Sequence, residues 1–153
     1  MLRKMPTLTH PIPLPASPSA HDLLQQGGER ITAAREAILD ILLQAPRALT
    51  HPSVEQEARA RGLSADRVTV YRVLDWLVAH GYAHRIAGED RVWRFNAATR
   101  GNHGHAHFHC QQCGQVFCLN DLQPVFSLNL PEGFRFEGAE LTIQGLCPQC
   151  SAS

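Results

Sequence analysis

The sequence predicts an α+β protein, in which an N-terminal winged helix-turn-helix domain precedes a small C-terminal α/β domain with paired cysteines. Successive helical patterns lead into a β-hairpin pattern, which is the element order of a winged helix. After residue 95 the chain changes to short strand-like runs, and all five cysteines lie in this second part. These observations divide the chain into two folding units.

The helical patterns are bounded by residues that start and stop helices. Helices are expected over 20–27, 32–45 and 50–62, ended by Gly-Gly, Ala-Pro and Gly in turn. A further helix lies within 64–81, where Ser64 is expected to provide the N-cap. Its apolar stripe consists of Val70, Val73, Leu74 and Leu77.

A β-hairpin is expected next, over 82–86 and 91–95. Apolar and polar residues alternate on both sides of a Gly-Glu-Asp turn at 88–90. The hairpin completes the first domain, and the small, polar residues after it predict a hinge. The expected divisions are a disordered, Pro-rich segment over 1–18, the winged helix over 19–95, the hinge over 96–105 and the second domain over 106–153.

Composition excludes several classes of protein. The 14 basic residues balance the 14 acidic ones, so any nucleic-acid contact must come from a local patch. Such a patch is expected between Arg59 and Arg72, where Arg61 and Arg67 also lie and Asp66 is the acidic residue against them. No apolar run reaches the length of about 18 residues needed to span a membrane. The N-terminal prolines do not resemble a signal peptide, which predicts a cytoplasmic protein.

The second domain contains two C-x-x-C pairs, Cys110 with Cys113 and Cys147 with Cys150. Two such pairs supply a closed tetrahedral shell of thiolates for zinc. A redox dithiol and cysteines that merely pack are the alternatives, but a redox pair usually stands alone. A closed shell leaves no open position for water, so the pattern predicts a structural zinc. Around it we expect strands over 107–110, 115–119, 133–137 and 139–145, and a brief helix near 121–128.

Several segments together resemble the ferric uptake regulator (Fur) superfamily. The run D-R-V-T-V-Y-R-V-L over 66–74 is similar to the family's recognition helix, and I-T-A-A-R over 31–35 is similar to its first helix start. The segment H-x-H-x-x-C-x-x-C-G over 105–114 is similar to its metal-binding segment. The resemblance spans about 20–150 in order. It implies a metal-activated repressor, not an enzyme, with a C-terminal dimerisation domain.

Within the family, the chain most resembles the zinc uptake regulator (Zur) branch. His84 stands where that branch has a sensory zinc ligand on the wing, and His103 stands where it has a second ligand. A cysteine ligand expected at the end of the wing is replaced by Phe95. A carboxylate ligand expected shortly after the first cysteine pair is replaced by Cys118. Imidazoles with one thiolate still favour Zn(II) over Fe(II) or Mn(II).

Four histidines alternate over 103–109 and would share one face of an extended strand. Of these, the resemblance places His105 and His107 in the metal-binding segment, whereas His109 is expected to be structural or solvent-facing. The expected regulatory ligands outnumber the positions of one zinc shell, so one is spare or at least two regulatory ions bind. They are His84, His103, His105, His107 and Cys118.

Many relatives also have a second regulatory site, which is not expected here. Its positions hold Gly104, Ala106 and Ala139, none of which offers a ligand atom. The same losses argue against a peroxide sensor, which would need oxidisable ligands around iron. A small zinc hydrolase is a weaker alternative, since no H-x-E or H-E-x-x-H element supplies a general base. A regulator that senses Fe, Mn or Ni remains open.

The resemblance implies that two recognition helices of a homodimer bind a palindromic DNA operator, which controls genes for zinc uptake. No membrane and no small organic substrate is expected as a partner. Tyr71 is expected to pack on a thymine methyl and Arg72 to read a guanine edge, while Trp76 is expected to pack. The remaining predicted DNA contacts are Arg67, Thr69, Arg35 and Thr32.

Overall fold

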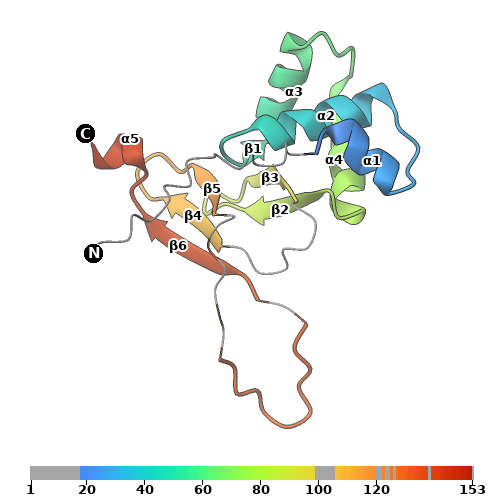
Figure 1. Cartoon of the computed structure of the whole chain (residues 1–153). Helices are drawn as coiled ribbons and strands as arrows, with labels where there is room; N and C mark the ends of the chain where they lie inside the picture. Colours follow the sequence, from blue (N-terminus) through green and yellow to red (C-terminus); the bar gives the residue numbers. More distant parts are fainter. Residues whose placement is uncertain are drawn as a thin grey trace, which may run out of the picture.

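The structure is a computed structural model of the chain that describes residues 18–98, 106–119, 122, 125, 127–137 and 139–152. Its first part is helical (Figure 1), with α1 (Ala20–Gln26), α2 (Ala33–Gln44), α3 (His51–Ala60) and α4 (Arg67–Ala79). No helix among these described ranges is long and apolar enough to cross a membrane.

Each of these helices begins after a polar residue whose side chain accepts a hydrogen bond from a first-turn amide. The caps are Ser19, Thr32, Thr50 and Asp66. Thr32 caps α2, in agreement with the predicted start of that helix at residue 32, but α4 is capped by Asp66 and not by Ser64. The Asp66 carboxylate accepts a hydrogen bond from the Thr69 amide at 2.7 Å. The positive N-terminal end of the helix dipole also stabilises its negative charge.

The core of the first domain lies around α2, which packs against α1, α3 and α4. Ile38, Leu39 and Leu42 of α2 are almost completely buried, together with Val54 of α3. The stripe predicted on α4 is buried in the same cluster, as the helical periodicity indicated. The cluster is made of residues before position 98, so this domain has a hydrophobic core of its own.

A three-stranded sheet adjoins these helices, with β1 (Leu49–Thr50), β2 (Ala83–Ala87) and β3 (Trp93–Ala97) in the order β1-β3-β2. All pairings are antiparallel, and β2 with β3 forms the predicted hairpin, the wing. Strand β3 continues to Ala97, so strand pairing includes Asn96 and Ala97 from the segment predicted as a hinge. Helices α2, α3 and α4 followed by this hairpin have the arrangement of a winged helix.

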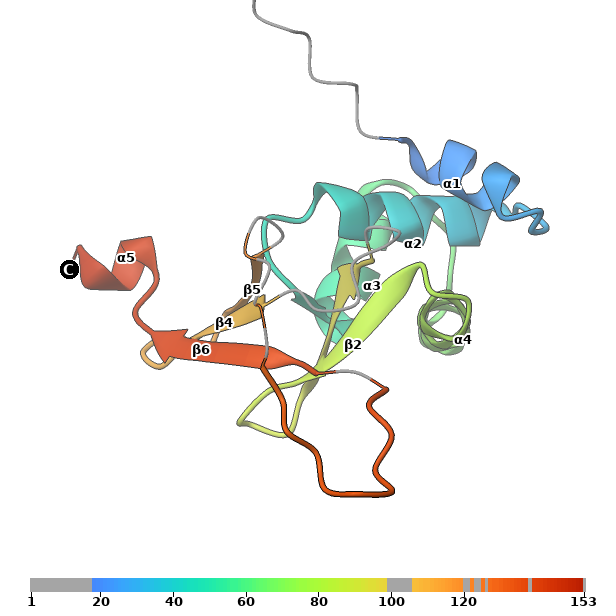
Figure 2. The same cartoon turned by 60° about the horizontal axis from the view of Figure 1, so that its bottom comes forward.

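The second sheet holds β4 (Ala106–Cys110), β5 (Val116–Leu119) and β6 (Leu141–Gly145) in the order β5-β4-β6, and α5 (Pro148–Ser151) follows. Strand β4 pairs antiparallel with β5 and parallel with β6 (Figure 2). Two predicted elements differ from this structure. The described residues 122, 125 and 127–130 are not helical, and 133–137 is a turn with irregular chain instead of a strand.

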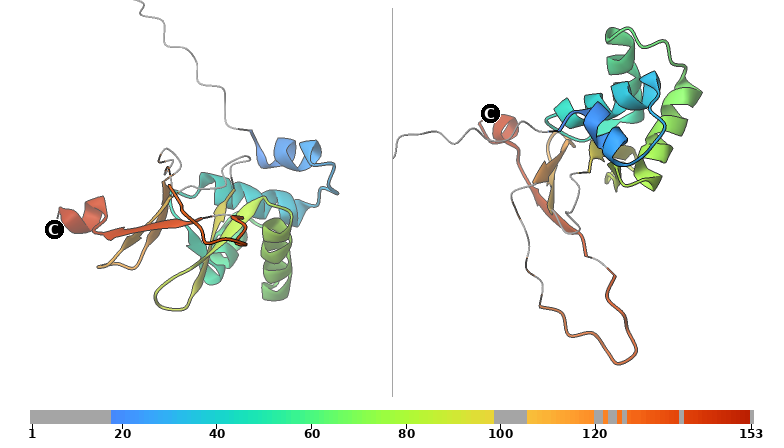
Figure 3. Two further views of the ribbon diagram at one scale, coloured as in Figure 1. Left: turned by 90° about the horizontal axis from the view of Figure 1, so that it is seen from below. Right: turned by 45° about the vertical axis from the view of Figure 1, so that its right-hand side comes forward.

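The two domains meet at a small contact away from α4. The Ala48 amide donates to the Val116 carbonyl at 2.8 Å, and Ile86 joins these two residues in an apolar cluster. Gln144 of β6 donates to the Glu89 carboxylate of the wing at 2.9 Å. Figures 2 and 3 show α4 on the side of the first domain that is remote from the second sheet. Helix α4 and the cysteines therefore lie in separate regions.

Candidate metal centres and nucleic-acid interface

Local structure brings the four cysteines together. Cys110 ends β4 and a tight turn returns the chain to β5, with Gly114 at φ 69°, a conformation that glycine adopts without steric cost. Cys147 is the N-cap of α5, and Pro148 follows at the first helical position. The parallel pairing of β4 with β6 places the ends of these strands side by side, so both cysteine pairs meet at one edge of the sheet.

The four sulfur atoms fit a tetrahedral zinc ion. They lie within 4.8 Å of one another, and the Cys113 and Cys147 sulfurs are 3.9 Å apart. Zinc–sulfur bonds of about 2.3 Å would place two ligands of a tetrahedron roughly 3.8 Å apart. The Cys147 amide also donates to the Cys110 sulfur at 3.3 Å, as expected for a knuckle that holds thiolates. This quartet supports the predicted structural site.

Without a cation the quartet cannot be fully ionised. The amides of Cys113 and Cys147 face the Cys110 sulfur and lower the pKa of that thiol to about 6. The Cys147 thiol and burial raise the pKa of Cys150 to about 12. Metal binding must therefore displace a proton from at least one thiol, which makes the affinity for zinc decrease as the pH falls.

Three of the predicted regulatory residues, His84, His107 and Cys118, lie on paired strands of two hairpins. His84 of β2 pairs across the wing with Asn96 of β3, and His107 of β4 pairs with Cys118 of β5. Burial raises the pKa of the Cys118 thiol, and the Asn96 side chain, which lies close enough to interact with this thiol, acts to lower it. Asn96 therefore connects the wing to the second sheet between His84 and Cys118.

These residues do not form a compact ligand shell by themselves. Within the described part of the chain, the cysteine quartet is the one group of three or more His, Cys, Asp or Glu side chains placed to hold an ion. His103 and His105 lie outside the described residues. Sequence reasoning missed Asn96, although it directly follows Phe95 in the segment where a ligand was expected. Phe95 itself is 3% exposed and belongs to the core.

The outer face of α4 carries the predicted base-reading residues. Tyr71 is 42% exposed and Val68 is 54% exposed, and Arg67 and Arg72 are exposed beside them. Among the described residues, neither arginine has an acidic partner within salt-bridge distance. Thr69 is half-buried, since it lies toward the core side. Val68 lies outside the predicted apolar stripe, so the helical periodicity is consistent with its exposure, although it was not counted among the predicted DNA contacts.

Two predicted phosphate contacts at the start of α2 have partners within the domain. Arg35 lies over the Trp76 ring, 3.7 Å from the centroid, and donates to the Arg30 carbonyl at 2.8 Å. Thr32 accepts from the Arg35 amide as the helix cap. Trp76 packs between elements, in agreement with its predicted role. Any contact of Arg35 with DNA would have to compete with this cation–π contact.

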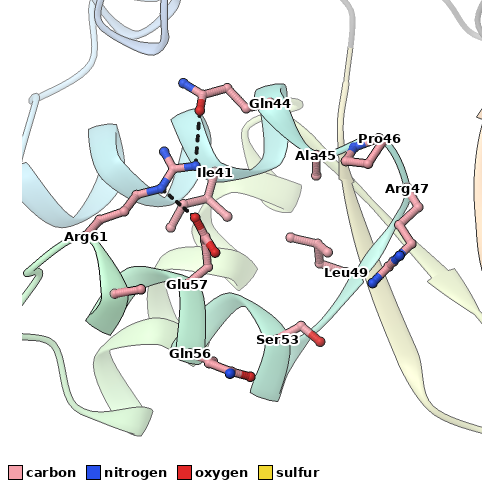
Figure 4. A pocket seen from close by; sticks show the side chains of 11 residues that line it. Ile41, Gln44, Ala45, Pro46, Arg47, Leu49, Ser53, Gln56, Glu57 and Arg61 are labelled. Atoms are coloured by element: carbon pink, nitrogen blue, oxygen red, sulfur yellow. Dashed lines mark hydrogen bonds and ion pairs between the residues drawn. The ribbon is translucent and has the colours of Figure 1, made fainter.

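The predicted basic patch is smaller than its sequence suggested. Arg61 lines a groove between α2 and α3, where it pairs with Glu57 and donates to Gln44 (Figure 4). It also pairs with Asp40 of α2. Arg59 pairs with Glu55 in the same helix. Because these carboxylates offset two of the four arginines, Arg67 and Arg72 carry most of the local positive charge.

Comparison with known proteins agrees with this arrangement. Residues 26–139 match the model of the ferric uptake regulator family. The transcriptional regulator FurA of Mycobacterium tuberculosis is 30% identical over 89% of this chain and 92% of its own. The zinc uptake regulation protein of Escherichia coli is 25% identical over 86% of this chain and 78% of its own. A zinc uptake regulator complexed with zinc and DNA superposes with a TM-score of 0.60 and 20% identity, over 87% of this chain and 91% of that one.

The fold, the thiolate quartet and these similarities define a metal-binding transcriptional regulator. The chain belongs to the ferric uptake regulator family. Members of this family are transcriptional regulators and not enzymes, so the alternative of a small zinc hydrolase is set aside.

Proposed function

We propose that the chain is a zinc-responsive repressor that binds palindromic operator DNA as a homodimer when its regulatory zinc site is filled. The observation that carries this proposal is the Asn96–Cys118 contact, which brings the His84 strand of the wing beside the His107–Cys118 pair of the second sheet. A metal ion bound by residues of both hairpins would join the two domains. The genes controlled would be those for zinc uptake.

The donor set favours zinc as the regulatory metal. Imidazole and thiolate ligands suit Zn(II), whereas Fe(II) and Mn(II) usually bind with carboxylates. His84, His107, Cys118 and the sequence-predicted His103 and His105 include no carboxylate. Similarity to the zinc uptake regulation protein supports this choice. Similarity to FurA is the observation that favours the competing function, a regulator of the same family that senses Fe, Mn or Ni.

The proposed switch depends on a difference in metal affinity between two arrangements of the domains. A metal that binds better when the wing lies against the second sheet shifts the population toward that arrangement. In a dimer, this would fix the separation and tilt of the two α4 helices. They could then enter successive major grooves of the operator. Zinc and DNA would each increase the affinity for the other by the same factor.

The connection between β5 and β6 supports the proposed dimer. Its described residues 127–137 extend away from the sheet (Figure 3). Phe134 is 70% exposed, Phe136 54% and Leu128 51%. Exposed apolar groups gathered in one segment usually mark a protein–protein contact. A second copy of the chain would cover them.

Selection from a random DNA pool would test the function and would identify the operator in the same experiment. The full chain, holding only its structural zinc, is mixed with duplexes that contain a randomised window, with added Zn(II) or with none. We expect a palindromic sequence to be enriched when zinc is added and not when it is omitted. Equal enrichment in both conditions would contradict the switch, and enrichment with Fe(II) or Mn(II) but not zinc would establish the competing function.

Two arginines of α4 should differ in their effect on this selected DNA. Arg72→Ala should cost about 1–3 kcal/mol of binding free energy and relax the preference at one base position. Arg67→Ala should weaken binding to all sequences and reduce the salt dependence by about one unit of slope. Titrations at several salt concentrations measure both effects. The same uniform loss for both variants would contradict base reading by Arg72.

A further inference from the structure

His51 is the first residue of α3, and its imidazole is buried against the recognition helix. The side chain is 5% exposed. Its ring stacks on Tyr71 of α4, with ring centroids 3.4 Å apart and an angle of 15° between the planes. This His51–Tyr71 stack connects the base of α3 to the outer face of α4.

Hydrogen bonding of the ring nitrogens does not explain why the His51 side chain is buried. Both ring nitrogens are buried and neither makes a hydrogen bond of good geometry within the described residues, although the Arg67 backbone lies close enough to act on the pKa of the ring. Buried polar atoms are usually paired, since an unsatisfied one destabilises the fold. The specific contact of this side chain is therefore made by the face of its ring.

The stack restricts a side chain that would otherwise be mobile. An exposed tyrosine on a helix can adopt two χ1 conformations, and ordering it on DNA binding would reduce the affinity. Contact with a ring held by another helix selects one of them. Tyr71 nevertheless remains 42% exposed, so part of its surface can still contact DNA.

We infer that His51 is a positioning residue, which holds Tyr71 in the orientation used to contact DNA bases. The inference rests on the proposed DNA-binding function for the role of Tyr71. It adds to that function a residue of α3 that does not itself need to contact DNA.

The stack should be most stable above about pH 6.5. Burial lowers the pKa of His51 from its usual 6.5, and the Arg67 guanidinium of α4 also acts to lower it, while Glu55 of α3, the Arg67 backbone and Asp75 of α4 act to raise it. The unfolded chain therefore takes up this proton at a higher pH than the folded chain. Neutral His51 therefore contributes its full stabilisation to the free energy of unfolding above about pH 6.5, and this contribution decreases as the pH falls further. His51→Phe should remove this pH dependence.

Base preference separates a positioning role from a merely structural one. In the random-duplex selection with added zinc, His51→Ala and Tyr71→Ala should lose preference at the same base positions, by about three- to tenfold. The double variant should lose no more than Tyr71→Ala alone, because His51 acts on the bases only through Tyr71. His51→Phe keeps a ring and should retain the wild-type profile. Unchanged preferences in His51→Ala, with loss in Tyr71→Ala, would overturn the inference.

Nuclear magnetic resonance tests the stack without DNA. The Cε1 proton of His51 should be shifted upfield by the Tyr71 ring, and Tyr71→Ala should remove that shift. Absence of the shift in the wild-type chain would overturn the inference even if DNA selection succeeds. Failure of the selection with the shift present would count against the proposed function instead. Loss of zinc-dependent binding in His51→Phe would assign the imidazole nitrogens to metal binding and also overturn the inference.

Discussion

Replacing Cys147 by Ser is expected to remove the structural zinc and to unfold the second sheet with it. The Cys147 sulfur lies 3.9 Å from that of Cys113, so the change removes one of the four sulfur ligands of the quartet. Zinc binding to such sites contributes on the order of 10 kcal/mol, which is comparable to the whole stability of a small domain. The first domain should remain folded, because its core contains no residue of the second sheet.

Metal content and hydrogen exchange would measure this result. The variant should contain about one zinc fewer per chain than the wild type. Amides of β4 should exchange rapidly, while those of α2 stay protected. Cys118→Ser is the matched control for folding, since it makes the same chemical change on β5 of the same sheet, outside the quartet. Because Cys118 is a proposed regulatory ligand, zinc is counted in all variants after mild chelation has removed the regulatory metal. Retention of zinc and of β4 protection in Cys147→Ser would show that the quartet does not hold this domain together.

The fold was predictable wherever a sequence pattern is settled by contacts within one domain. The stripe on α4 predicts burial because the helices that cover it come from the same short stretch of chain. The described residues between 122 and 137 were misjudged for the opposite reason. Phe134 and Phe136 alternate as they would on a half-buried strand, but both are exposed. An apolar pattern indicates that a surface is to be covered, without saying whether this chain or another covers it.

The two candidate metal centres differ in the same way. The cysteine quartet was predictable because the spacing within each pair is local. The proposed regulatory site depends on the pairing of His84 with Asn96 and on the approach of Asn96 to Cys118, which no spacing in the sequence reveals. The pairing of Arg61 with Glu57 was overlooked although it has a local signal. Residues four apart on a helix face each other, so this carboxylate should have been counted against the basic patch.

Replacing His84 by Ala should abolish zinc-dependent DNA binding and leave the structural zinc in place. His84 is the wing residue of the proposed regulatory site, so without it a bound metal no longer joins the wing to the second sheet. Coupling between two binding sites is typically about 5- to 150-fold, and the ratio of DNA affinities with and without added zinc should fall from that range to about one. Because His84 is half-buried, the free energy of unfolding should change by no more than about 1 kcal/mol.

His21→Ala is the appropriate control for this experiment. His21 is an exposed histidine of α1 whose imidazole lies 3.4 Å from Glu36, remote in sequence from both cysteine pairs. This variant removes one imidazole from the chain and should respond to zinc as the wild type does. DNA titrations on the selected duplex, with zinc stoichiometry measured before and after mild chelation, compare the two. A wild-type zinc response in His84→Ala would remove the wing from the metal site. Loss of the structural zinc or of folding in that variant would instead make His84 part of the scaffold, and the regulatory metal would then have to bind within the second domain alone.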